Sequence, residues 1–209
     1  AGDAYKAGFF AAGPLAGEAQ AAAESLGEPA AVALLALWSA LDEATRRWLL
    51  PWAARVAPDQ ARPLVLSSLA ADSPHLHEAL RAAAELSVPA QVLEPLLTDA
   101  RAEVRLAAAR LVPTGSWSAR LAAEPEPEVR AALVARLDSL EALAAALSDG
   151  DWRVRSAAAQ ALVARGEAGR GAARTVFIER GASDPARCAA AWALTAMGDD
   201  GWLSQQVAP

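Results

Sequence analysis

A signature that recurs every 25 residues is the feature that most limits how this chain can fold. Each copy has an acidic residue, four further residues, a valine, an arginine and then a run of small residues. The valines of the three strongest copies are Val104, Val129 and Val154. A period of this length is typical of stacked supersecondary units, none of which can bury its apolar face alone. The chain is therefore predicted to fold as a repeat array.

The composition predicts that each unit of the array is helical. Among 209 residues there are 58 alanines and 28 leucines, against one isoleucine, one tyrosine and three phenylalanines. Strong helix formers dominate, and residues that favour strands are scarce. Shorter apolar segments lie between the copies, and glycines and prolines mark the joints. We expect an all-α fold, a right-handed superhelix (solenoid) of about six helix pairs.

Weaker copies extend the array toward both ends of the chain. A copy near the C-terminus places Arg187 before a run of small residues, 32 positions after Arg155. Upstream, the Leu-Gly-Glu-Pro sequence at 26–29 indicates the end of one helix and the start of the next. We therefore assign residues 18–209 to the array and residues 1–17 to an N-terminal segment of unclear role.

The signature, the Leu-Gly-Glu-Pro joint and the period of 25 to 32 residues resemble HEAT repeats. The resemblance is to the short bacterial form named after phycobilisome lyases. It covers about residues 18–205 and is strongest over 97–165. It implies an array of helix pairs but little about function, because that repeat occurs in lyases, scaffolds and regulatory proteins alike.

The acids and arginines of the signature are the first candidates for a site. The acids are Asp99, Glu124 and Asp149, and the arginines are Arg105, Arg130, Arg155 and Arg187. Stacking would align the arginines in a row, which could bind anions or nucleic acid. The acids favour a structural interpretation, because a carboxylate at a helix start can cap amides and pair with a neighbouring arginine. The resemblance implies the same, so we predict that these residues form a structural ladder between repeats.

The charge distribution argues against nucleic acid as the partner. The net charge is −6, with 13 acidic and 7 basic residues before position 105 and 12 of each from there on. Nucleic-acid binding normally needs a basic face that releases counterions. The acidic half is expected to prefer a basic partner segment, and the neutral, arginine-rich half an acidic or aromatic one.

The location is predicted from two simpler observations. No apolar run is long enough to span a membrane, so no membrane partner is expected. The single cysteine, Cys188, forms no internal disulfide, which fits a reducing compartment. We therefore expect a cytoplasmic protein.

No pattern in the sequence predicts an active site, a metal or a cofactor. His75 and His77 lie two positions apart, so on a helix their side chains diverge and cannot chelate one ion as a pair. Cys188 lies in an apolar helical stretch and is interpreted as a buried, unreactive thiol. The glycine-rich stretch 166–171 is interpreted as a helix connection, and recognised nucleophile, phosphate and zinc motifs are absent.

Seven tryptophans beside a single tyrosine are the remaining anomaly. Alanine-rich helices have little room to bury so many indoles, so some should be exposed. Trp38, Trp48 and Trp192 lie within apolar helical patterns and are predicted to be in the core.

A contact patch is predicted from the tryptophans and arginines near helix starts, because these residue types are enriched in protein-binding hot spots. The patch consists of Trp117, Arg120, Trp152 and Arg153. Trp152 corresponds to Pro127 and Ala102 in the two preceding repeats, so stacking does not require an indole there. We therefore expect Trp152 to be at least partly exposed.

The leading hypothesis is a non-enzymatic interaction or scaffold module that binds another protein. Repeat arrays present an extended concave surface, here expected to be lined by the second helix of each pair. One alternative is a chromophore lyase or related enzyme, but no catalytic constellation supports it. The other is a HEAT-like DNA-repair glycosylase, against which the acidic charge argues. The sequence indicates neither the identity of the partner nor the oligomeric state.

Overall fold

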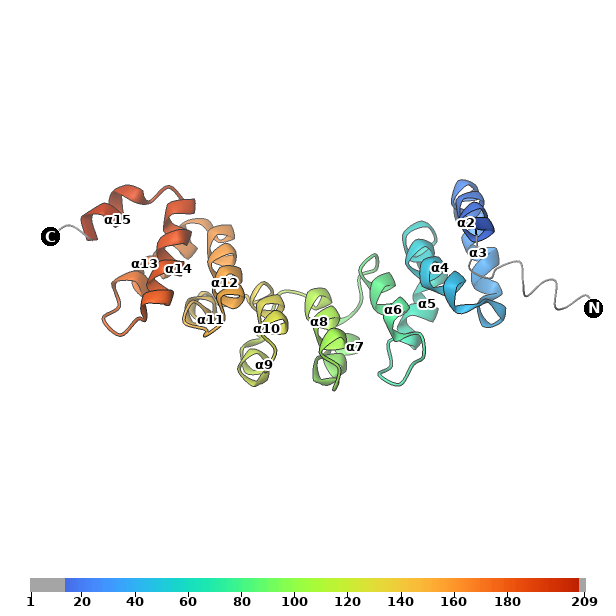
Figure 1. Cartoon of the computed structure of the whole chain (residues 1–209), viewed down its shortest axis with the longest axis horizontal. Coiled ribbons are helices and arrows are strands. Elements are labelled where there is room, and N and C mark those ends of the chain that lie inside the picture. The colour runs from blue at the N-terminus through green and yellow to red at the C-terminus, as the bar shows by residue number, and fades with distance from the viewer. Residues whose placement is uncertain (1–13, 207–209) are drawn as a thin grey trace, which may run out of the picture. The chain divides into compact units, whose positions relative to one another are not determined.

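The computed structural model describes residues 14–206, which form helices joined by short connections (Figure 1). The chain divides after Asp99 into two compact units. The helices of the first unit are α2 (Pro14–Leu26), α3 (Glu28–Ala36), η1 (Trp38–Ala40), α4 (Glu43–Val56), α5 (Pro58–Ser68), α6 (Leu76–Ala83), α7 (Ala90–Leu93) and η2 (Glu94–Thr98). Those of the second unit are α8 (Ala102–Leu111), α9 (Ser118–Ala123), α10 (Pro127–Val134), α11 (Leu140–Ala146), α12 (Trp152–Ala164), α13 (Gly166–Ile178), α14 (Asp184–Ala196) and α15 (Asp200–Gln206).

Several helix boundaries follow local signals in the sequence. Ser139 caps α11 by accepting a hydrogen bond from the Ala142 N–H at 3.2 Å, and Ser183 caps α14 by accepting one from the Ala186 N–H at 3.3 Å. Such caps satisfy amides that the first helical turn leaves unpaired. Gly166 has a φ of 58°, which residues with a side chain rarely adopt. This conformation lets α13 begin almost directly after α12.

In the first unit, α4 is the central helix and packs against α3, α5 and α6. Its buried face carries Leu49, Leu50 and Trp52. Val65 of α5 and Leu76 of α6 are buried as well. These side chains belong to the apolar core of the unit.

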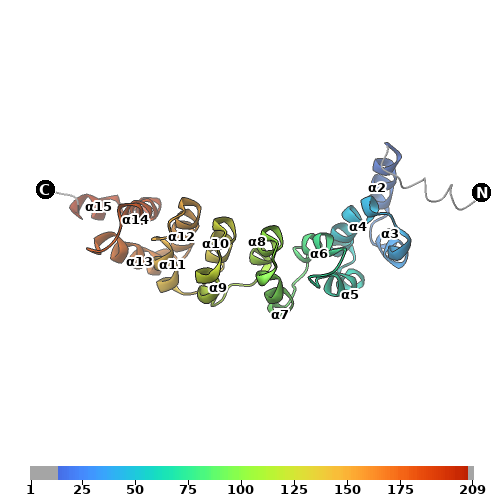
Figure 2. The same ribbon diagram turned by 60° about the horizontal axis from the view of Figure 1, so that its bottom comes forward.

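In the second unit, helices of the same kind lie side by side. The second helices of successive pairs, α8, α10, α12 and α14, pack against one another in order, and the first helices α11 and α13 also pack together (Figure 2). The core contains leucines such as Leu143 and Leu162 beside alanines such as Ala158 and Ala190. The small alanines let neighbouring helices approach closely while the leucines fill the remaining volume.

The second helices of this unit share one register. α8, α10, α12 and α14 begin at Ala102, Pro127, Trp152 and Asp184, and an arginine stands three positions after each start. The period lengthens in the last repeat, because α12 and α13 each have 13 residues where α10 and α11 have 8 and 7. The shared register makes equivalent positions of different repeats directly comparable.

The predicted all-α fold of helix pairs is confirmed. Within residues 14–206 the only β feature is an isolated bridge between Gly115 and Leu137, which joins the connections before α9 and α11. The interpretation of 166–171 as a connection is wrong. This stretch forms the first turns of α13. Of its three glycines only Gly166 has a positive φ, so the other two do not interrupt the helix.

Most of the predicted N-terminal segment lies outside the described residues, since α2 begins at Pro14. The boundary between residues 17 and 18 therefore stays a prediction. No helix within residues 14–206 is long and apolar enough to cross a membrane.

Candidate functional site

Arg105 of α8 binds the carboxylate of Glu124, which directly follows α9. Arg105 Nη2 lies 3.0 Å from Glu124 Oε1, and Nε lies 3.1 Å from Oε2, so the guanidinium contacts both oxygens. Glu124 also accepts hydrogen bonds from Arg120 at 2.8 Å and from the Glu126 N–H at 3.1 Å. Arg105 and Glu124 are both buried. The carboxylate is therefore well paired although it is removed from water.

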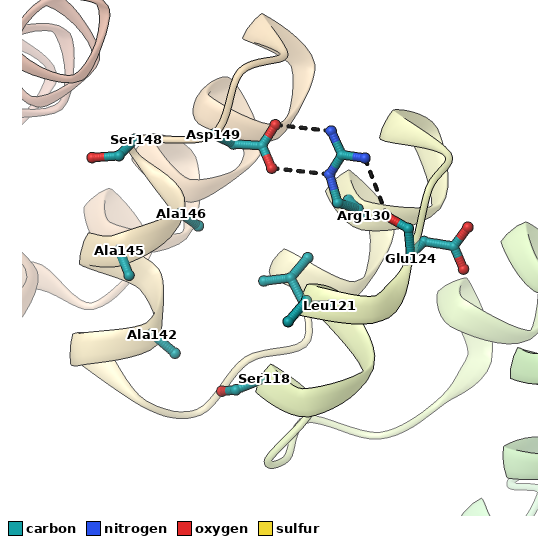
Figure 3. A pocket seen from close by; sticks show the side chains of 10 residues that line it. Ser118, Leu121, Glu124, Arg130, Ala142, Ala145, Ala146, Ser148 and Asp149 are labelled. Atoms are coloured by element: carbon teal, nitrogen blue, oxygen red, sulfur yellow. Dashed lines mark hydrogen bonds and ion pairs between the residues drawn. The ribbon is translucent and has the colours of Figure 1, made fainter. Parts of the chain in front are cut away.

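Arg130 of α10 makes the equivalent arrangement one repeat later (Figure 3). Its Nε and Nη2 donate to the two oxygens of Asp149 at 2.9 and 3.0 Å. Its Nη1 donates to the backbone carbonyls of Glu124 and Pro125 at 3.2 and 2.8 Å. Asp149 also accepts from the Asp151 N–H at 2.8 Å. One guanidinium thus ties the connection before its own helix to the equivalent connection of the next repeat.

A cavity of about 470 Å³ lies beside this pair, between α9 and α11 (Figure 3). Its walls are mostly small side chains, among them Ala142 and Ala145. Its charged groups are Glu124, Arg130 and Asp149, which all take part in the hydrogen bonds described above. The cavity therefore offers a ligand apolar walls but no charged side chain without a partner.

The hydrogen bonds decide the charge of both carboxylates. Burial raises the pKa of Glu124, but hydrogen bonds from Arg105, the Glu126 N–H and Arg120 outweigh burial and hold the pKa below its ordinary value of 4.5. Burial also raises the pKa of Asp149, and the hydrogen bond from Arg130 leads the opposing effects that bring it below 3.8. Both residues are therefore ionised at neutral pH.

The last two arginines of the predicted ladder have no carboxylate partner among residues 14–206. Arg155 donates from Nη1 to the carbonyls of Asp149 and Gly150 at 2.8 and 3.0 Å. Arg187 donates to the carbonyl of Glu179 at 3.1 Å. A glycine stands six positions before Arg187, where the preceding repeats have their acid.

Asp99, the first acid of the predicted ladder, follows η2 at the end of the first unit. Its backbone N–H donates to the Leu96 carbonyl at 3.2 Å. Within the second unit the structure thus pairs two of the predicted acids, Glu124 and Asp149, with two of the predicted arginines, Arg105 and Arg130. The structural role of the whole ladder stays a prediction, because it concerns stability.

Two members of the predicted contact patch are engaged within the protein. Trp117 is half-buried, donates from its indole N–H to the Pro113 carbonyl at 2.9 Å, and packs against the core of the second unit. Arg120 is paired with Glu124 at 2.8 Å. Among the described residues, no hydrogen bond or ring contact joins them to the other two members, which begin α12.

Those other two members, Trp152 and Arg153, have different surroundings. Trp152 is 66% exposed, which confirms its predicted exposure. Arg153 donates to both carboxylate oxygens of Asp151 at 3.0 Å and to Glu128 at 3.1 Å. Hydrogen bonds from the side chain and backbone of Arg153 lower the pKa of Asp151 to about 2. Trp152 is therefore the member of the patch whose side chain is most available to a partner.

Trp152 lines a groove between the second helices α12 and α14, which we call the α12–α14 groove. Its volume is about 270 Å³. Its walls include Trp152, Arg155 and Ser156 from α12 and Pro185, Cys188 and Trp192 from α14. Two indoles, one guanidinium and one thiol thus meet in a single depression of the surface.

The structure corrects two predictions on α14. Trp192 is 51% exposed and is not in the core, and Cys188 is exposed and not buried. The two residues are four positions apart and share the outer face of the helix, whereas Ala186, Ala190 and Leu194 face the core. The prediction failed because this stretch is apolar on nearly every side, so hydrophobicity alone does not identify the buried face.

The repeat register contains a signal that would have identified Trp192 as exposed. Its equivalent positions in the preceding repeats are Gln160, Ala135 and Arg110, and all three are exposed. Trp192 therefore departs from the repeat pattern in the same way as Trp152 does. Comparison between repeats identifies both indoles as exposed, whereas local hydrophobicity placed Trp192 in the core.

The tryptophans and histidines of the first unit lie mainly at the edge of its core. Trp38 and Trp48 are half-buried, where the sequence predicted core positions. Trp38 contacts His75 edge to face, with ring centroids 5.3 Å apart, and His77 is exposed. No group of three or more potential metal ligands is found within residues 14–206.

Comparison with known proteins gives one family. Residues 139–164, which contain α11 and α12, match the HEAT repeat. The searches of curated proteins and of solved structures gave no match. The matched repeat and the all-helical structure together support a HEAT-like repeat protein. The narrower bacterial form that the sequence resembles stays a prediction.

Proposed function

We propose that this chain is a non-enzymatic module that binds another protein through the second helices of its second unit. The observation that carries the proposal is the pair of exposed indoles, Trp152 and Trp192, which line the same groove. HEAT repeats are generally protein-interaction scaffolds, which supports this assignment.

Physical chemistry favours a protein as the partner. Tryptophan is the residue type most typical of binding hot spots, because a rigid indole buries a large area at low entropic cost. Exposed apolar side chains that gather in one depression mark interaction sites more often than isolated ones do. Stacking is not expected to require these indoles, since other repeats have Pro127 and Gln160 in their places. Binding is therefore the better reason for their presence.

The experiment is capture of a partner by variants of the intact chain. Immobilised wild-type protein is incubated with an extract of the source organism, and bound proteins are identified by mass spectrometry. Trp152→Ala and Trp192→Ala should each lower the yield of the same partner while leaving the melting temperature nearly unchanged. Ile178→Ala is the matched control, because Ile178 is also a large exposed apolar residue, at the end of the first helix α13. Equal capture by all four proteins would contradict the proposal.

A further inference from the structure

Arg130 and Arg155 stand at equivalent positions in successive repeats. One side of the guanidinium makes the same hydrogen bonds in both residues, whereas the opposite side differs. In both, Nη1 donates to two backbone carbonyls of the connection before the helix. In Arg130 the opposite edge, Nε and Nη2, holds both oxygens of Asp149. In Arg155 that edge makes no hydrogen bond with any residue in the described range 14–206.

The difference has a cause in the sequence of the next repeat. Glu124 and Asp149, the acids that serve Arg105 and Arg130, stand six positions before the arginine of the following repeat. The same position before Arg187 is Gly181, which has no side chain to offer. We call the edge formed by Nε and Nη2 the fork of the arginine. The forks of Arg105 and Arg130 thus hold an acid of the following repeat, whereas the fork of Arg155 meets a repeat that has no acid at this position.

The fork of Arg155 belongs to the α12–α14 groove, which contains the exposed indoles Trp152 and Trp192. Among the residues that line this groove, Arg155 carries the charge. Asp184, the first residue of α14, does not line the groove and offers Arg155 no carboxylate there. Its hydrogen bonds to the carbonyls of Asp149 and Gly150 hold the guanidinium in place before anything binds. A fork that is already oriented loses little entropy when it pairs with a planar carboxylate.

We propose that the α12–α14 groove binds a segment of a partner protein in which an aspartate or glutamate stands next to a large apolar residue. The side-chain carboxylate of that segment takes the place on Arg155 that Asp149 takes on Arg130. The apolar neighbour lies against Trp152 and Trp192. This inference rests on the proposed function and adds the chemistry of the partner.

Charge complementarity decides between this occupant and others. A basic segment would bring a second positive charge to Arg155, and a purely apolar segment would cover the guanidinium edge without pairing it, which costs free energy. A carboxylate satisfies that edge with two charge-assisted hydrogen bonds, as in the Arg105 and Arg130 pairs. In both the Arg105 and the Arg130 pair the carboxylate belongs to a side chain, so we expect the partner segment to supply a side-chain carboxylate and not a terminal one.

The test uses a variant that supplies the missing acid from within. Gly181→Asp places a carboxylate at the position of Glu124 and Asp149, and a side chain fits there, because a Cβ at Gly181 would meet nothing within 4 Å. The new aspartate should pair with Arg155, raise the melting temperature and compete with the partner segment. Gly171→Asp is the matched control, because Gly171 is an exposed glycine of α13 with the same free space. It adds the same charge away from the α12–α14 groove.

The probe is a library of random 12-residue peptides displayed on phage and selected on the full-length wild-type chain. Displayed peptides joined to the coat protein by their C-termini have no free terminal carboxylate, so any selected acid is a side chain. The selected sequences should share an aspartate or glutamate beside a large apolar residue. A synthetic, capped peptide of the selected sequence should bind Gly181→Asp and Arg155→Lys at least about tenfold more weakly than the wild type and Gly171→Asp.

Cys188 gives an independent measure of where the peptide binds. It is the single cysteine of the chain, is exposed and lines the groove. Saturating peptide should therefore slow its alkylation by iodoacetamide in the wild type. Unchanged alkylation with a bound peptide would place the peptide elsewhere and overturn the proposal.

Three other results would overturn it as well. They are a selected consensus without an acid, equal peptide affinity of wild type and Gly181→Asp, and dimerisation of the wild type that Gly181→Asp abolishes, which would make a second copy the occupant. If Gly181→Asp fails to fold, Arg155→Lys decides, and unchanged affinity contradicts the proposal. A different result tests the proposed function separately from the carboxylate inference. If the tryptophan variants lose a captured partner and Gly181→Asp retains it, the protein is a binding module but the carboxylate inference is wrong.

Discussion

Arg130 and Asp149 stand 19 positions apart, and their side chains share two hydrogen bonds, from Nε to Oδ2 at 2.9 Å and from Nη2 to Oδ1 at 3.0 Å. Arg105 and Glu124 repeat this relationship at the same spacing. Each pair joins a second helix to the connection of the following repeat. The pairs therefore couple neighbouring repeats through polar contacts as well as through the apolar core.

Arg130→Ala and Asp149→Ala should each lower the free energy of unfolding by about 1–3 kcal/mol, because each change leaves a mostly buried charged partner without its hydrogen bonds. The double variant should lose less than the sum of the two. Urea denaturation followed by circular dichroism measures these values. Arg153→Ala is the control and should change stability little, because its ion pairs are near the surface. A loss of partner binding at unchanged stability would favour a ligand-binding row over a structural ladder.

Acid should remove the stabilisation that ionised Glu124 provides. Its folded-state pKa lies below the ordinary value of 4.5, so this contribution is complete above pH 4.5 and is lost as the pH falls below it. Glu124→Gln should therefore be less stable than the wild type at neutral pH, and the difference should shrink toward acid pH. Denaturation curves of both proteins across this range measure it. A difference that is independent of pH would show that the charge is not responsible.

Two glycines of α13 should respond in opposite ways to alanine. A Cβ on Gly169 would overlap the backbone carbonyl of Leu162 in α12, so Gly169→Ala must push the two helices apart and lower stability markedly. Gly171 has free space around it, and Gly171→Ala should raise stability by about 0.5–1 kcal/mol through helix propensity. Thermal melting of both variants gives the comparison. Similar melting temperatures would contradict the close packing of α12 on α13.

The indoles of Trp152 and Trp192 should be accessible to solvent. Acrylamide quenching of the wild type should fall clearly in Trp152→Phe and in Trp192→Phe, because each change removes an accessible emitter. Trp52 is 6% exposed, so Trp52→Phe should remove a protected emitter and leave the quenchable part unchanged. Neither exposed variant should unfold the protein. If Trp152→Phe unfolds it, the indole supports the core and does not belong to a binding surface.

The repeat pattern predicted the helices and their pairing, because these depend on contacts close in sequence and on a period that any stacked array must keep. The start of α12 at Trp152 and its equivalence to Pro127 follow from that period. The exposure of Trp152 was predictable for the same reason, since a residue that other repeats lack is not needed for stacking.

Tertiary structure decided which carboxylate each arginine holds, and it showed which face of α14 is buried where local hydrophobicity did not. The apolar sequence around Trp192 fits burial on either side, and the packing of α14 against α12 and α13 selects the face that carries Ala190 and Leu194. The sequence indicated that acids and arginines pair, but the partner of Arg130 lies 19 positions ahead and comes close only when the repeats stack. The unpaired fork of Arg155 emerges the same way, because only the stacked register shows that Gly181 stands where an acid would complete it.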